Sequence, residues 1–366
     1  MKRVVAIILV IFTSLPSASA NQEVLIAAPS YRTANGVFVS DELAVRLSAS
    51  GDLGGRLFQS IAKANQVAID IALIEEIQDL IDGYSYLDGE GKEVAVAEFP
   101  TAAIWLETLR RSLANKEVVS LPYGNPDSVF LKRTAPVEYR FYREIAAARL
   151  SGFLGAPLGD VDSINPTDRG AGQTARVLHR TNRSELRRLY QVVPAPEVLS
   201  LRLELAKILN PMIPAESLPI HAKDLRDVLA ENSKKLRVAV GNYTVTASNY
   251  DLPITLINDY SLPATVELRA QPDNSRILVI DRERVTIPAN SQIQVALPIQ
   301  VIASGDSDLR VGLFANSGKE IGKAGVIPLR LAVISPVTTW FTTGMAIILL
   351  MAAVIQSIRR IKNRKS

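Results

Sequence analysis

Four polar residues follow two apolar runs, at points where a parallel sheet would present them together. Asp70 ends the first run, and Tyr123, Asn125 and Asp127 lie in the loop after the second run, 117–121. Ligands meet α/β sheets at the carboxyl ends of the strands, so this edge is the candidate site. Asp70 and Asp127 could act as a carboxylate pair that binds sugar hydroxyls or a metal ion, or that performs acid–base chemistry on a glycosidic bond.

The same two carboxylates have a structural alternative. Asp70 comes directly before a predicted helix, and Asp127 ends a loop whose Pro and Gly residues build tight turns. An Asp at either position can cap a helix by accepting a hydrogen bond from its first backbone N–H groups. The sequence does not give the separation of the two carboxyl groups, so both interpretations stay open.

The elements that would position these residues alternate between strand and helix. Apolar periodicity predicts helices over 53–64, 71–82 and 100–113, and short apolar runs predict strands over 67–70 and 117–121. This order favours a parallel sheet. Because a full eight-stranded barrel usually needs about 250 residues, we expect a partial or degenerate barrel-like α/β region.

From about residue 236 the hydrophobic pattern changes to a period of two. The clearest strand alternates Ile293, Val295 and Leu297 with polar residues, and seven or eight such runs are separated by turn residues before 334. This pattern suits an immunoglobulin-like β-sandwich. Its polar positions contain no acid–base pair, so we expect a spacer or adhesion role for it.

The two ends of the chain predict where the protein is located in the cell. Residues 1–20 have the basic start, apolar run and Ala-Ser-Ala site of a secretory signal, with an uncleaved anchor as the alternative. The apolar stretch 337–357 would form a helix of roughly 31 Å, enough to cross a bilayer, with a buried core helix as the alternative. The basic tail 358–366 follows the positive-inside rule. We therefore expect a single-pass protein of the cell membrane, with its bulk outside and its tail in the cytoplasm.

A second candidate site is a run of arginines in the middle of the chain. Guanidinium groups can hold lipid headgroups, a lipid-linked pyrophosphate or an anionic wall polymer through bidentate contacts. The alternative is a solvated helix face that pairs with local acids such as Glu185. The residues we select as binding candidates are Arg176, Arg180, Arg183 and Arg187.

Composition excludes several classes of function. The chain has no cysteine, and its two histidines, His179 and His221, are far apart in sequence, so we expect no metal site. It has no Walker loop, dinucleotide glycine pattern or Ser-His-Asp arrangement, so we expect no cofactor. The 41 basic residues include seven at the two ends, which leaves 34 against 37 acidic residues. The positive net charge therefore gives no reason to expect nucleic-acid binding.

Three segments together resemble an uncharacterised family of actinobacterial cell-envelope proteins. They read VAIDIALI from Val67, AAIWLETL from Ala102, which includes Trp105, and LPYGNPD from Leu121. The resemblance implies a signal peptide, a region similar to polysaccharide-deacetylase or glycosidase barrels, an immunoglobulin-like domain and a C-terminal membrane helix. It also implies a cell-envelope setting, with genes near that of the peptidoglycan lipid-precursor flippase. Trp105 is a further binding candidate. Asn125 stands where the family pattern has an acid, which favours binding over catalysis.

We therefore expect an α/β region, an all-β immunoglobulin-like sandwich and one C-terminal transmembrane helix. The favoured function is a membrane-anchored extracytoplasmic binding or scaffold protein linked to cell-wall biogenesis, with an envelope glycan or lipid-linked precursor as ligand. The alternatives are a carbohydrate-active hydrolase or deacetylase, and an accessory subunit of a polytopic membrane protein. The predicted divisions are the signal 1–20, an extension 21–50, the α/β region 51–193, a helical linker 194–235, the sandwich 236–334, the membrane helix 337–357 and the tail 358–366.

Overall fold

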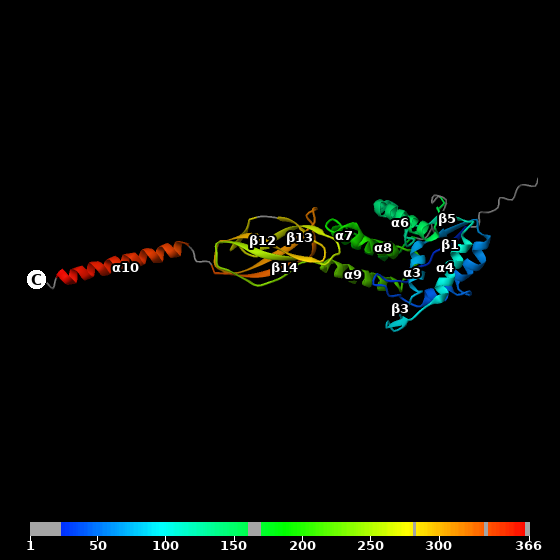
Figure 1. Cartoon of the computed structure of the whole chain (residues 1–366), viewed down its shortest axis with the longest axis horizontal. Helices are drawn as coiled ribbons and strands as arrows, with labels where there is room; N and C mark the ends of the chain where they lie inside the picture. Colours follow the sequence, from blue (N-terminus) through cyan, green and yellow to red (C-terminus); the bar gives the residue numbers. More distant parts are fainter. Residues whose placement is uncertain (1–22, 160–169, 281–282, 333–335, 363–366) are drawn as a thin grey trace, which may run out of the picture. The chain divides into compact units, whose positions relative to one another are not determined.

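The structure is a computed structural model of the whole chain, drawn in Figure 1. It describes residues 23–159, 170–280, 283–332 and 336–362, with only the backbone described at 283, 336–342 and 357–362. The predicted signal segment 1–20 lies outside these residues. The chain divides into two compact units, the first made of Met1–Val177 with Ala206–Ala222, and the second of Leu178–Leu205 with Lys223–Ser366.

A parallel sheet lies at the centre of the first unit. Its strands are β1 (Glu23–Ile26), β2 (Gln66–Ile69) and β5 (Glu117–Ser120), in the order β1-β2-β5. The predicted α/β class and the strands at 67–70 and 117–121 are confirmed. The predicted extension 21–50 contains the first strand of this sheet, since every residue of β1 pairs with β2 and its Ile26 is fully buried. Three strands are too few to close a barrel.

Helices cover this sheet, and the predicted ones are present. The segment predicted over 53–64 is helical as far as Lys63, but it passes from α2 into a π turn and then a 3-10 turn, and Ala64 is extended. The helix predicted over 100–113 begins at Pro100, and Phe99 holds its N-cap position without a side-chain hydrogen bond. The helices of this unit are α1 (Glu42–Leu47), α2 (Asp52–Gly55), α3 (Ile71–Asp79), α4 (Pro100–Ser112), α5 (Ser128–Thr134) and α6 (Pro136–Leu154).

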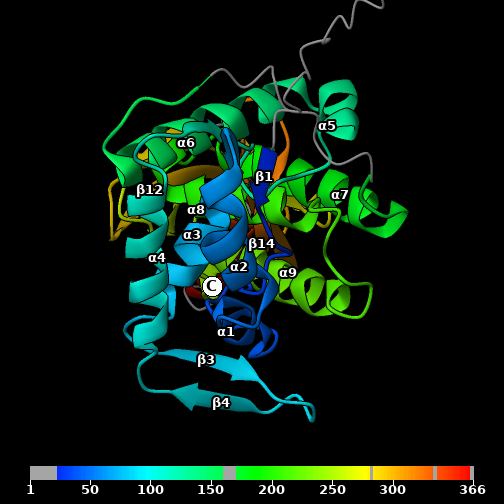
Figure 2. The same ribbon diagram turned by 90° about the vertical axis from the view of Figure 1, so that its right-hand side faces the viewer.

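A hairpin that the sequence pattern did not predict extends beside the lower end of α4 in Figure 2. It consists of β3 (Tyr84–Leu87) and β4 (Glu93–Val96). Phe38 attaches it to the unit, since the Phe38 N–H donates to Ser85 O and its carbonyl accepts from Leu87 N. The hairpin has only half-exposed residues on β3, which explains why its hydrophobic signal is weak.

Three helices have residues in both units: α7 (Gln173–Leu189), α8 (Ala195–Ile208) and α9 (Leu218–Lys234). This division differs from the predicted boundary at 193 and from a linker over 194–235. Residues 206–222 belong to the first unit because its loops bond to them. The Asp127 N–H donates to Leu209 O at 2.9 Å, and Asn210 Nδ2 donates to Ala28 O at 2.9 Å.

The second unit contains the predicted β-sandwich, which is confirmed. Its two sheets have the orders β10-β12-β8-β6 and β11-β9-β13-β14-β7, and all their pairs are antiparallel except β14 with β7. Alternate residues of the long strands are buried, as the period of two predicts. The strands are β6 (Leu236–Val238), β7 (Tyr243–Val245), β8 (Asn249–Asn258), β9 (Ala264–Pro272), β10 (Ile277–Val279), β11 (Glu283–Ile287), β12 (Ser291–Val301), β13 (Gly305–Phe314) and β14 (Glu320–Leu331).

The last helix is α10 (Pro336–Lys362). Within the residues that the structure describes, no helix combines the length and the apolar character needed to cross a membrane. The predicted span 337–357 extends beyond the described side chains, since those of 337–342 and 357 lie outside them.

Candidate functional site

The carboxyl ends of β1, β2 and β5 meet at one edge of the sheet, and polar residues follow each strand there. The backbone N–H of Asp70 donates to Ile26 O at 3.0 Å, and that of Leu121 donates to Ile69 O at 2.9 Å. These bonds continue the ladder past the strand ends and fix the start of each loop. The edge therefore brings together the loops after all three strands, of which the sequence predicts those after β2 and β5.

Asp70 is buried at this edge, with 2% of its surface exposed. Its Oδ1 accepts hydrogen bonds from Ala72 N, at 3.0 Å, and from Gly124 N, at 2.9 Å. The first bond caps α3 and the second attaches the loop after β5. The capping role proposed as an alternative is thus present. No hydrogen bond to Oδ2 comes from the described residues.

Burial raises the pKa of Asp70 to about 7, and the nearby charges of Glu76 and Glu75 act in the same direction. The two backbone hydrogen bonds oppose this shift because they favour the ionised form. Near neutral pH Asp70 therefore exists as a mixture of protonated and ionised carboxyl groups.

The loop after β5 approaches α8 closely. Gly124 has φ +73° and Asn125 has φ +44°, both in the left-handed region. A Cβ on Gly124 would lie 3.1 Å from the Lys207 backbone, so only glycine fits at this point. Asn125 is buried, and its Nδ2 has no hydrogen-bond partner among the described residues.

Asp127 is buried, and both of its carboxyl oxygens accept hydrogen bonds. Oδ1 accepts from Phe130 N at 2.9 Å and caps α5. Oδ2 accepts from Ala171 N at 3.0 Å and from Arg176, whose Nη2 is 2.7 Å and whose Nε is 3.0 Å away. Four hydrogen bonds leave this carboxylate little capacity to bind a substrate or to transfer a proton.

Tyr123 joins a partly exposed cluster at the same edge. Its hydroxyl donates to Glu75 Oε2 at 2.6 Å, and Arg149 Nη1 donates to the other oxygen, Oε1, at 2.7 Å. The Arg149 guanidinium also lies 5.5 Å from the centre of the Tyr123 ring. Tyr123 is itself buried, so the polar surface of the cluster comes mainly from Glu75 and Arg149.

A buried ion pair that the sequence patterns do not predict lies next to this edge. Glu76 Oε1 lies 3.2 Å from Lys207 Nζ, and the two side chains are 4% and 5% exposed. Glu76 also accepts from Ser30 Oγ at 2.5 Å and from Tyr31 N at 2.9 Å. This cluster joins the loop after β1, helix α3 and the end of α8. The one available signal was a glutamate among the apolar residues of the predicted helix 71–82.

His221, which we did not select, is also buried near Lys207. Burial, with the Lys207 charge acting in the same direction, lowers the pKa of His221 to about 4, and a hydrogen bond with the Ser30 backbone opposes this shift. Its Nε2 has no hydrogen-bond partner among the described residues. Within those residues no three His, Asp or Glu side chains converge as a metal site.

The remaining predicted binding residues do not gather at this edge. Trp105 is 1% exposed, and therefore belongs to the core of its unit and not to an accessible binding surface. Arg176 is engaged with Asp127 in the first unit. Arg180 and Arg187 are exposed on the part of α7 that belongs to the second unit, and Arg183 is half-buried there.

The raised pKa of Asp70 predicts a measurable pH dependence. The folded-state pKa lies above the ordinary value near 3.9, so ionisation of Asp70 opposes folding as the pH rises from about 4 to about 7. His221 has the opposite effect in wild type. Its folded-state pKa of about 4 lies below the ordinary value of 6.5, so stability is lost as the pH falls from about 6.5 towards 4. The difference between Asp70→Asn and wild type isolates the Asp70 contribution.

We expect Asp70→Asn to gain stability relative to wild type by up to about 1.4 kcal/mol per pH unit between pH 4 and 7. Urea unfolding at several pH values, followed by Trp105 fluorescence in a Trp340→Phe background, measures this difference in the first unit. Asp82→Asn, at an exposed position before the hairpin, is the control and should show a flat difference. A flat difference for Asp70→Asn as well would contradict the proposed ionisation.

Comparisons with known proteins describe the second half of the chain. Among curated proteins no sequence matches this chain. WR4, a member of the MSP family of C. elegans, is similar at 11% identity over 27% of this chain and 98% of its own, with a TM-score of 0.21. The CARDB domain of the PF1109 protein of Pyrococcus furiosus is similar at 6% identity over 28% of this chain and 93% of its own, with a TM-score of 0.20. Residues 221–365, which contain all the sandwich strands and α10, match a family of unknown function, DUF6049.

Proposed function

We propose that this chain is a membrane-attached binding or scaffold protein of the cell envelope, linked to cell-wall biogenesis. The first unit, together with the exposed arginines of α7, engages an envelope glycan or a lipid-linked precursor, the sandwich acts as a spacer, and α10 is a single-pass anchor. The bulk of the chain lies outside the cell membrane and the basic tail lies in the cytoplasm. The described side chains of α10 and the state of the two candidate carboxylates support this proposal.

The four hydrogen bonds that Asp127 accepts are the observation that best supports a binding role over a catalytic one. A glycosidase needs two carboxyl groups that reach the substrate, one to transfer a proton and one to act on the sugar or on water. The Asp127 oxygens accept hydrogen bonds from Phe130, Ala171 and Arg176. Asp70 Oδ1 accepts hydrogen bonds from Ala72 and Gly124. Both carboxyl groups therefore hold loops in place, which fits a binding protein better than a hydrolase.

The surface of α10 supports attachment to a membrane. Eight large apolar side chains between Met345 and Ile355 are exposed, by 51% to 70%, and their positions surround the helix. A helix that is apolar on all sides is buried in a core or in lipid. Five basic residues follow this stretch after Ile358, on the side that the positive-inside rule assigns to the cytoplasm.

A hydrolase or deacetylase remains the second candidate, because Asp70 has one feature that such enzymes use. Its pKa of about 7 suits a general acid or base near neutral pH, and its Oδ2 receives no hydrogen bond from the described residues. The burial of Asp70 and the absence of a free second carboxyl at Asp127 weigh against this role.

The exposed arginines of α7 give a test of the binding function. We expect the full-length protein in lipid nanodiscs to sediment with insoluble peptidoglycan, an anionic polymer, and to sediment less as salt rises. The double variant Arg180→Gln and Arg187→Gln should weaken this binding about tenfold or more, since each arginine near an anionic surface contributes about 1 kcal/mol.

The control makes the same change of charge elsewhere. Arg133 and Arg140 are exposed in the first unit, and replacing both by Gln should leave sedimentation unchanged. An equal loss in both double variants would show that net charge alone causes the binding. No sedimentation of the wild-type protein at low salt would contradict a glycan-binding role.

A further inference from the structure

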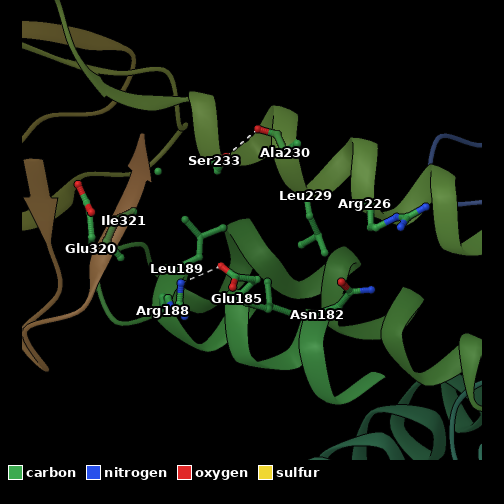
Figure 3. A pocket seen from close by; sticks show the side chains of 12 residues that line it. Asn182, Glu185, Arg188, Leu189, Arg226, Leu229, Ala230, Ser233, Glu320 and Ile321 are labelled. Carbon is green, nitrogen blue, oxygen red and sulfur yellow. Dashed lines mark hydrogen bonds and ion pairs between the residues drawn. The ribbon is translucent and has the colours of Figure 1, made fainter. Parts of the chain in front are cut away.

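A cavity of about 320 Å³ lies within the second unit, between α7, α9 and the start of β14 (Figure 3). Its apolar lining includes Leu186, Leu189, Leu229 and Ile321. The volume falls in the range of pockets that hold small ligands, which are mostly apolar with a few polar groups that fix orientation. The cavity belongs to a different unit from the sheet edge and is independent of the function proposed for that edge.

Asn182 is the polar group that distinguishes this cavity. It is 4% exposed, and its Nδ2 has no hydrogen-bond partner among the described residues. Figure 3 shows its amide in the space between α7 and α9. A buried donor without an acceptor destabilises a protein, and a ligand oxygen at this position would satisfy it.

The other polar groups of the cavity leave donors in excess. Glu185 accepts from Arg188 at 3.1 Å, and both oxygens of Glu320 accept from Arg310 at 2.8 Å, so the two acids are already neutralised. Arg226 is exposed and forms no hydrogen bond or ion pair within the described part of the chain. The donors that remain in the cavity can therefore bind an anion or another hydrogen-bond acceptor.

These groups are arranged along the cavity. In Figure 3 Asn182 and Arg226 lie at one end, Leu189 and Leu229 in the middle, and Ile321 at the other end. One end offers an amide donor and a free guanidinium, and the rest offers apolar surface.

We propose that this cavity binds a small amphiphile with a carboxylate head and an apolar body. The carboxylate accepts from Asn182 Nδ2 and pairs with Arg226, and the body packs against Leu186, Leu189, Leu229 and Ile321. A charged acceptor is favoured over a neutral one because Arg226 forms the stronger, charge-assisted hydrogen bond with an anion.

A titration of the full-length protein in lipid nanodiscs with 3-phenylpropionate tests this proposal. The acid is water-soluble, and empty nanodiscs provide the blank for ligand-observed NMR. We expect a Kd of about 1 mM or tighter, as suits a ligand of this size. The alcohol 3-phenylpropanol and the cation 3-phenylpropylammonium should each bind at least about tenfold more weakly.

Two variants locate the binding. Asn182→Leu removes the donor and should weaken binding about tenfold without lowering the thermal midpoint, because it also removes an unsatisfied polar group. Arg226→Gln, at an exposed position, should weaken binding by a similar factor. Lys223→Gln makes the same change of charge on the same helix outside the cavity lining, and should leave the affinity unchanged.

Three results would overturn the proposal: no binding at millimolar concentrations, equal affinity for the acid, the alcohol and the ammonium ion, or an unchanged affinity in both variants. If Asn182→Leu does not fold, Arg226→Gln decides alone, because the exposed Arg226 has no partner among the described residues to lose.

Discussion

Lys207→Met should lower the free energy of unfolding of the first unit by about 3 to 5 kcal/mol. Breaking a buried ion pair from one side leaves the other charge buried and unpaired, which is one of the largest costs that a single substitution causes. Lys207 and Glu76 are 5% and 4% exposed and 3.2 Å apart. The hydrogen bonds that Glu76 accepts from Ser30 and Tyr31 hold its carboxylate in place after the lysine is removed.

Urea unfolding monitored by Trp105 in a Trp340→Phe background measures this effect. Adding Glu76→Gln to Lys207→Met should recover most of the loss, because a buried pair can be replaced by neutral groups at little cost. Lys63→Met is the control, since Lys63 is exposed in the first unit, and should change stability by no more than about 0.5 kcal/mol. An equal effect of Lys207→Met and Lys63→Met would show that the buried pair does not stabilise the fold.

Asp127→Asn should lower the free energy of unfolding by about 2 to 4 kcal/mol. The amide keeps one oxygen for the Phe130 N–H, but it places an NH₂ group against the Ala171 N–H and the Arg176 guanidinium, which are both donors. Arg176→Gln should cost less, about 1 to 2 kcal/mol, because Asp127 then keeps two backbone donors and the arginine is 30% exposed.

The same fluorescence assay compares the two variants. Glu107→Gln, in a surface cluster with Arg110 and Arg111 on α4, is the control and should change stability by less than about 0.5 kcal/mol. We expect Asp127→Asn to lower the free energy of unfolding most, Arg176→Gln to lower it less and Glu107→Gln to lower it least. If Arg176→Gln costs more than Asp127→Asn, the Asp127 carboxylate does not organise this contact as described.

Local patterns predicted the elements whose residues alternate clearly between buried and exposed. Helix α4 and the long strands of the sandwich follow from periods of 3.6 and 2 residues, respectively. Strand β5 follows from a short apolar run. The caps at Asp70 and Asp127 were predicted as alternatives, because an Asp before a helix has a simple local role.

The rest depends on contacts between distant parts of the chain. Nothing in the four residues of β1 indicates that they pair with β2, more than 40 positions later. Lys207 lies 131 positions after Glu76, and no local pattern predicts that these charges meet. The assignment of 206–222 to the first unit likewise follows from hydrogen bonds to Ala28 and Asp127, which the helical periodicity of that segment does not encode.

The most direct test of the account is the release of reducing ends and acetate from peptidoglycan fragments by the full-length wild-type protein, measured beside Asp70→Asn and Asp127→Asn. If these carboxylates hold loops and do no chemistry, the wild-type protein releases neither product above the blank, and Asp127→Asn differs from it in stability alone. Release by wild type that disappears in either variant, while that variant keeps the wild-type free energy of unfolding, would contradict the account and identify the edge of the sheet as an active site.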